Sequence, residues 1–140
     1  MFKKVSPELF HQFLENKIIQ HNKSKVSVST NSRYNDRICY AYEKNFKYKA
    51  GISIECYWGI MHINYLWVDE SLRGKKIGKE LLSFAEKLAI DKNCMIIYLE
   101  TFSFQAPEFY KKNGFEEFGK LNNIPDENST LYFMKKNLKG

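Results

Sequence analysis

The spacing of apolar residues divides the chain into segments with two different periods. Residues 7–22 and 76–90 carry apolar side chains three or four positions apart, which predicts two helices. Residues 38–44, 48–57 and 61–68 have strand character and are separated by short turns, which predicts an antiparallel meander. The first half of the chain is therefore expected to hold one helix and three consecutive strands.

The chain then continues as a βαβ unit. A continuous apolar run at 95–99 predicts a strand over 95–100 that is buried on both sides and pairs in parallel with strand 61–68. The buried face of the connecting helix is predicted from its periodic apolar positions, Ile77, Leu81, Phe84, Ala85 and Leu88. Asn93 is expected to follow this helix in a left-handed conformation.

Three more elements complete the predicted fold. Residues 106–113 predict a short helix, and residues 115–121 and 130–137 predict two final strands with a polar loop between them. The polar stretch 23–35 is expected to be mainly a loop.

Length and composition restrict the class of protein. The chain has 140 residues, which fits one domain over residues 1–140. The longest apolar run, Cys94–Leu99, is far too short to span a membrane, and the first residues lack the apolar core of a secretory signal. We therefore expect a soluble cytoplasmic protein without a membrane partner.

The net charge of +6 leaves a nucleic-acid partner open but disfavoured. Only three of the 22 cationic residues are arginines, Arg33, Arg37 and Arg73. Surfaces that read base sequence rely on arginine for bidentate contacts, whereas lysines often only keep a surface soluble.

The three cysteines are widely spaced, and the three histidines are scattered. No C-x-x-C pair occurs, so we expect reduced core thiols and no metal site.

One segment, Arg73–Lys79, combines two glycines and four cations where strand 61–68 gives way to the long helix. The first N–H groups of a helix have no partner within the helix, and the helix dipole adds positive charge there. The segment is therefore a candidate phosphate site, although a solvated turn explains the same residues. A P-loop and the G-x-G-x-x-G dinucleotide motif are both excluded by the glycine spacing.

The residues from Arg73 to Gly78 resemble the R/Q-x-x-G-x-G/A loop of the GNAT superfamily of N-acetyltransferases, with Lys76 at the first glycine position. A second hallmark is Tyr110, which lies four residues before Gly114. The resemblance is specific from about residue 62 to residue 118. It implies one α/β domain whose central mixed, mostly antiparallel sheet splits into a V between strands 61–68 and 95–101, flanked by helices.

The resemblance also implies acetyl-CoA as the cofactor. The strand before the loop would pair with the pantetheine arm, and the loop would bind the diphosphate. These implied cofactor-binding residues are Leu66, Trp67, Val68, Arg73, Gly74, Lys75, Lys76, Ile77, Gly78 and Lys79. A backbone N–H near Trp67–Val68 would stabilise the oxyanion.

Three side chains are candidates for the chemistry of direct transfer to a primary amine of a small molecule or peptide. By resemblance, Tyr110 would protonate the departing thiolate, and its ordinary pKa near 10 suits that acid role. His62 is the candidate base, although it could equally be a structural residue of a sheet face. Glu100 could bind the cationic amine or act as the base.

Two alternatives to an acetyltransferase stay open at this point. A catalytically silent CoA-binding module would fit the lysine at position 76 and the uncertain base, and a small nucleic-acid-binding domain would fit the positive charge. The amine acceptor is not indicated by the sequence, and sheet edges could pair two copies into a homodimer.

Overall fold

A six-stranded sheet forms the centre of the molecule in the computed structural model, which describes residues 1–26 and 37–138. The elements in chain order are α1 (Pro7–Lys23), β1 (Arg37–Lys44), β2 (Lys47–Tyr57), β3 (Ile60–Val68), η2 (Glu70–Leu72), α2 (Ile77–Asp91), β4 (Ile96–Phe102), α3 (Pro107–Lys112), β5 (Glu116–Asn122) and β6 (Thr130–Asn137). The predicted strands and helices are confirmed to within two residues at almost every end. Most of the predicted 23–35 loop lies outside the described residues.

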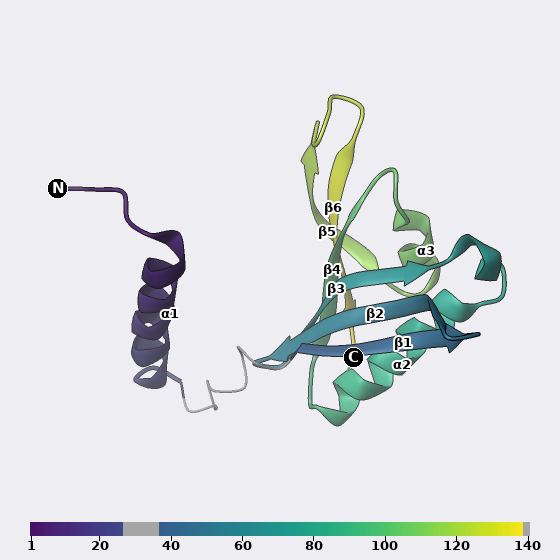
Figure 1. Cartoon of the computed structure of the whole chain (residues 1–140), viewed down its shortest axis with the longest axis horizontal. Coiled ribbons are helices and arrows are strands. Elements are labelled where there is room, and N and C mark those ends of the chain that lie inside the picture. Colours follow the sequence, from purple (N-terminus) through teal and green to yellow (C-terminus); the bar gives the residue numbers. More distant parts are fainter. Residues whose placement is uncertain (27–36, 139–140) are drawn as a thin grey trace.

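The sheet has the mixed, mostly antiparallel character that was expected. Its strand order is β1-β2-β3-β4-β6-β5, and every neighbouring pair is antiparallel except β3 and β4 (Figure 1). These two parallel strands pair only from Ile60 to His62 on β3 and from Ile96 to Tyr98 on β4. Beyond that point each strand continues without its partner, so the predicted V-shaped split is confirmed.

Helix α2 covers one face of the sheet, but with a different face from the one predicted. Its buried residues are Leu82, Ala85 and Ala89, whereas Phe84 is 44% exposed and packs edge-on against Tyr40. The prediction of Phe84 as a core residue was therefore wrong. The two alanines bring the helix backbone close to the sheet, and Leu81 and Leu88 pack at the margin of the core.

Strand β4 is also less buried than its apolar sequence predicted. Ile97, Leu99 and Thr101 face the core, whereas Glu100 on the other face is exposed. This second face of the sheet carries the polar side chains that are described below as the candidate site.

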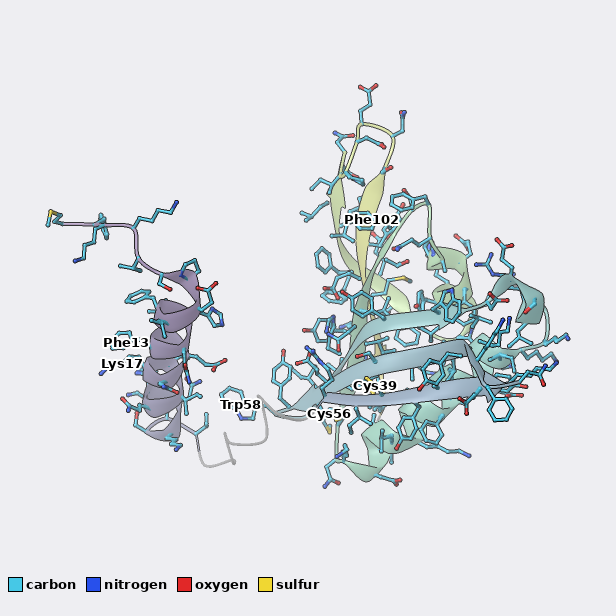
Figure 2. All side chains as sticks on the ribbon, in the orientation of Figure 1. Phe13, Lys17, Cys39, Cys56, Trp58 and Phe102 are labelled. Carbon is cyan, nitrogen blue, oxygen red and sulfur yellow. The ribbon has the colours of Figure 1, made fainter. Side chains whose placement is uncertain are left out.

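Helix α1 stands apart from the sheet, and none of its residues is buried (Figure 1). Its apolar residues Leu9, Phe10 and Phe13 are exposed, and Lys17 lies over the ring of Phe13 (Figure 2). Ser6 occupies the predicted N-cap position, but its hydroxyl bonds to Glu8 rather than to a helix N–H.

The cysteines correct one further prediction. Cys56 and Cys94 are buried, as expected of core thiols, but Cys39 is exposed on β1. Among the residues that the structure describes, no helix is both long enough and apolar enough to cross a bilayer.

Candidate active site

The loop between β3 and α2 turns through two left-handed residues. Gly74 has a φ of 81°, and Lys76, at the N-cap of α2, has a φ of 64°. A left-handed conformation costs a residue with a Cβ more than it costs glycine. This requirement gives a physical reason for glycine at the position that Lys76 occupies in this chain.

The side chains of this loop are directed to solvent. Arg73, Lys75, Lys76 and Lys79 are all exposed, and none of the ion pairs found in residues 1–26 and 37–138 involves them. Their charges surround the N-terminus of a 15-residue helix. Such an arrangement is suited to binding phosphate groups.

Where β3 and β4 have separated, the edge of β3 that faces β4 exposes backbone groups. The N–H of Asp69 donates to the carbonyl of Lys49 on β2 at 2.8 Å, and Val68 is the register partner of Ala50. Because hydrogen-bonded pairs alternate along an antiparallel ladder, the N–H groups of Leu66 and Val68 point away from β2. They therefore face the open side of β3, where an extended ligand can accept their hydrogen bonds.

The structure brings together two of the candidate catalytic side chains, His62 and Glu100. They lie on adjacent strands, and Nε2 of His62 is 2.5 Å from Oε1 of Glu100. The His62 side chain is 19% exposed and that of Glu100 is 38% exposed. The pair lies just where β3 and β4 stop pairing, so it borders the opening of the split.

A second group of polar residues supports this pair from β1, β2 and β3. Nδ2 of Asn64 lies 2.9 Å from Oε1 of Glu55 and 3.2 Å from Nδ1 of His62. Arg37 forms an ion pair with the same Glu55 oxygen at 2.9 Å. The hydrogen bond from Arg37 is the main reason that the pKa of Glu55 is lowered, and burial opposes that shift.

Two tyrosines complete the surroundings of His62. The ring of Tyr98 lies 4.5 Å from the imidazole, centroid to centroid, and its hydroxyl is 3.4 Å from that of Tyr57. Burial is the first cause that raises the pKa of Tyr98, and the contact with Tyr57 is the second. The phenol of Tyr98 therefore stays neutral beside the imidazole near pH 7.

Tyr110 lies on the short helix α3 and is nearly buried. Its ring packs edge-on against both Phe109 and Phe115, and burial raises the pKa of its phenol. A phenol in this environment keeps its proton at neutral pH, as a general acid requires. The neighbouring Phe109 contacts Gly78, which places α3 beside the start of α2.

A cavity of about 310 Å³ adjoins the same end of α2. Lys79, Ser83 and Glu86 line it from α2, and residues 112–115 line it from the end of α3. Lys136 bonds to Glu86 at 2.9 Å and to the carbonyl oxygen of Asn113 at 3.1 Å, which links α2 to the end of α3. Lys79 belongs both to the loop and to the lining of this cavity, so the two adjoin each other.

A family model described as "Acetyltransferase (GNAT) domain" matches residues 35–117, more than half of the chain. The chain belongs to the GNAT acetyltransferase family. The matched range includes β1 to β4, the Arg73–Lys79 loop, α2 and α3, and extends into β5. The predicted membership of the family is thus confirmed, and acetyl-CoA is the cofactor that this family uses.

Individual relatives agree with this membership. Blasticidin-S acetyltransferase of Streptomyces morookaense is 31% identical over 87 residues, which are 61% of this chain and 64% of that protein. The chain thus matches less than two thirds of that curated relative. The crystal structure of an acetyltransferase from Bacillus cereus ATCC 14579 is 32% identical, covers 99% of this chain and 98% of its own, and has a TM-score of 0.87.

With a more distant solved structure, the chain shares the fold alone. That structure is an aminoglycoside 6'-N-acetyltransferase complexed with coenzyme A, 20% identical, with a TM-score of 0.67 over 99% of this chain and 96% of its own.

Sequence reasoning named His62 and Glu100 separately and missed the residues that hold them. The signal for Asn64 was present, because His62 and Asn64 are two positions apart on a strand with polar residues in alternation. The contact of Asn64 with Glu55 also depends on a register shift after Ser53, which the sequence does not reveal.

Proposed function

We propose that this GNAT protein transfers the acetyl group of acetyl-CoA directly to a primary amine of a small molecule. The observation that carries the proposal is the His62–Glu100 pair at the opening of the split. His62 lies on β3, the strand that leads to the Arg73–Lys79 loop, and Glu100 lies on the neighbouring β4. A pair of proton-accepting groups at this point lies where the thioester and an amine would meet.

The cofactor would be held by backbone groups and by charge. In this proposal the diphosphate binds to the N–H groups at the start of α2, with Arg73, Lys75, Lys76 and Lys79 around it. Gly74, Ile77 and Gly78 supply the backbone of that turn. The pantetheine arm adds to the open side of β3 at Leu66, Trp67 and Val68, in the manner of an added strand.

Three groups would carry the reaction. The His62–Glu100 pair takes a proton from the ammonium, because only the neutral amine is a nucleophile. The N–H of Val68 donates to the thioester oxygen as negative charge develops on it. The phenol of Tyr110 gives its proton to the departing thiolate, and burial supports that role by keeping the phenol protonated.

A cationic acceptor fits the charge on this face of the sheet. Glu100 places a carboxylate near the opening, in a protein whose net charge is +6, whereas the charge of Glu55 is compensated by Arg37. Glu100 would attract an ammonium group more strongly than a neutral acceptor. A relative whose name is Blasticidin-S acetyltransferase supports a small-molecule amine over a peptide as the first acceptor to test.

Two measurements on the same protein test the proposal. Acetyl-CoA should raise the melting temperature, because a ligand that binds only the native state stabilises it. Thiol release from acetyl-CoA should then depend on an added amine, from a panel of nucleoside and aminoglycoside antibiotics, polyamines and peptides. A thermal shift without acetylation of any amine would instead indicate a silent CoA-binding module. If neither a thermal shift nor acetylation is observed, and the protein binds RNA or DNA in a salt-dependent way, the nucleic-acid alternative would be favoured.

A further inference from the structure

The donor and the acceptor of each hydrogen bond around His62 can be assigned, and the assignment starts from Glu55. A carboxylate can only accept hydrogen bonds, and the lowered pKa of Glu55 keeps it ionised at neutral pH. The Asn64 atom 2.9 Å from it must therefore be the amide nitrogen, which donates. The orientation of the Asn64 amide thus follows from chemistry.

The same amide nitrogen determines which imidazole nitrogen carries the proton. Asn64 Nδ2 lies 3.2 Å from His62 Nδ1, and an amide N–H group can only donate to a ring nitrogen that has no proton. The proton of the neutral imidazole must then be on Nε2, which lies against Glu100. All four hydrogen bonds of the series Arg37–Glu55–Asn64–His62–Glu100 are satisfied by this arrangement.

We infer that Glu100 is the group that accepts the proton of the acceptor amine, and that Asn64 is the positioning residue that holds His62 as a hydrogen-bond donor to it. This inference rests on the proposed function and chooses between the expected roles, in which His62 was the candidate base and Glu100 either bound the amine or acted as the base. His62 would have to take up the proton at Nδ1, which the Asn64 amide already occupies. Glu100 is also the more exposed of the two side chains and so is the easier for an amine to reach.

Glu55 and Arg37 prevent the alternative arrangement. If the Asn64 amide turned over, its oxygen could accept from a protonated Nδ1, but the same oxygen would then face the Glu55 carboxylate. In the present arrangement Asn64 Oδ1 is buried and has no hydrogen-bond partner among the described residues. A buried oxygen without a hydrogen-bond partner destabilises the fold, so the contacts of Nδ2 must outweigh that cost.

The other groups near His62 do not change this assignment. Glu55 and Tyr57 face it from β2, Tyr98 stacks on it from β4, and Lys135 of β6 is the register partner of Tyr98. Lys135 lies 4.0 Å from Glu116, which offsets part of its charge.

The proton balance of the step is complete without another reagent. The ammonium loses one proton to Glu100, and the neutral amine forms the C–N bond as the C–S bond breaks. Tyr110 protonates the thiolate, and the second proton of the new amide nitrogen returns to the tyrosinate. Glu100 releases its proton to solvent after the product leaves.

The decisive test reads the histidine tautomer and does not depend on activity. In protein with ¹⁵N-labelled histidine, NMR should show the proton of the neutral His62 ring on Nε2. Asn64→Asp places an acceptor at Nδ1 and should move the proton to Nδ1 or make the ring cationic. Asn64→Leu keeps the branching and the number of side-chain heavy atoms but removes the donor, so it should leave Nδ1 free to take up a proton. His11 and His21 on α1 serve as unchanged references, and Asn16→Asp on the same helix is the control for added charge.

Kinetics with an amine acceptor then separate the roles. Glu100→Gln should lower kcat/KM about 100-fold or more and remove the acid limb of its pH profile. Asn64→Asp should shift that limb while leaving the KM for acetyl-CoA within about twofold. A proton on Nδ1 in the wild type, imidazole signals that Asn64→Asp leaves unchanged, or an unaltered pH profile in Glu100→Gln would each overturn the inference. A protein that acetylates no amine but shows the expected tautomer would contradict the proposed function and the base role of Glu100, and leave only the role of Asn64 standing.

Discussion

The ring of Phe109 lies directly against the α-carbon of Gly78. A Cβ at position 78 would be only 3.0 Å from Cζ and 3.3 Å from Cε1 of that ring. The contact joins the start of α2, which is the candidate phosphate site, to α3, which carries Tyr110. Gly78 is therefore needed for the packing of α3 against the start of α2.

Replacement of Gly78 by alanine should destabilise the fold and displace α3. We expect a loss of about 1 kcal/mol in the free energy of unfolding. This value is at the low end of the usual cost of overpacking, because the end of the Phe109 ring can shift. Urea denaturation measures this change. Gly119→Ala is the control, since a Cβ there would meet Phe133 at 3.8 Å, an ordinary contact. Equal stabilities of the two variants would show that the Gly78 contact is not tight.

Lys76→Gly should stabilise the protein. The lysine has a φ of 64°, and relief of this left-handed conformation should raise the free energy of unfolding by about 0.5–1 kcal/mol. Lys75→Gly removes the same charge from a neighbour without positive φ, so it should not stabilise. Affinities for acetyl-CoA, measured by calorimetry, should fall by similar factors in both variants if the lysines act only through charge. A destabilised Lys76→Gly variant would contradict the strain argument.

The elements of this fold follow from sequence patterns, but two important details do not. Strand and helix periods place β2, β3, α2 and β4 within a residue or two, and the loop motif places the candidate phosphate site. The buried face of α2 differs from the predicted one because the small residues Ala85 and Ala89 lie against the sheet. Apolar periodicity alone favours the larger Phe84. The His62–Glu100 contact depends on cross-strand register, which apolar alternation alone does not specify.

Removal of the Tyr110 hydroxyl should slow turnover without loss of cofactor binding. Tyr110→Phe keeps the ring that packs on Phe109 and Phe115, so the fold and the affinity for acetyl-CoA should be nearly unchanged. If the phenol is the acid, kcat should fall by about 100-fold. Tyr132→Phe, on β6, is the matched control for loss of a hydroxyl from a partly buried ring. Unchanged turnover in Tyr110→Phe would exclude the acid role.

The same variant tests the burial of Tyr110 through alkaline stability. Burial raises the pKa of the folded-state phenol above the unfolded value, which is near 10. The stabilisation is therefore complete below about pH 10 and is lost as the pH rises towards the folded-state pKa, because the unfolded chain releases its proton first. Relative to Tyr110→Phe, the wild type should lose stability as the pH rises above about 10. Parallel stability curves for the two proteins would contradict this burial effect.

The most direct test of the central claim follows the acetyl group itself. Acetyl-CoA labelled with ¹³C at the carbonyl should be mixed with the protein and an amine acceptor taken from the thiol-release panel. The account predicts that the carbonyl signal moves from the thioester to an amide position, at a rate that Glu100→Gln lowers about 100-fold. A signal that stays in the thioester with every amine, or that appears only as free acetate, would contradict the account.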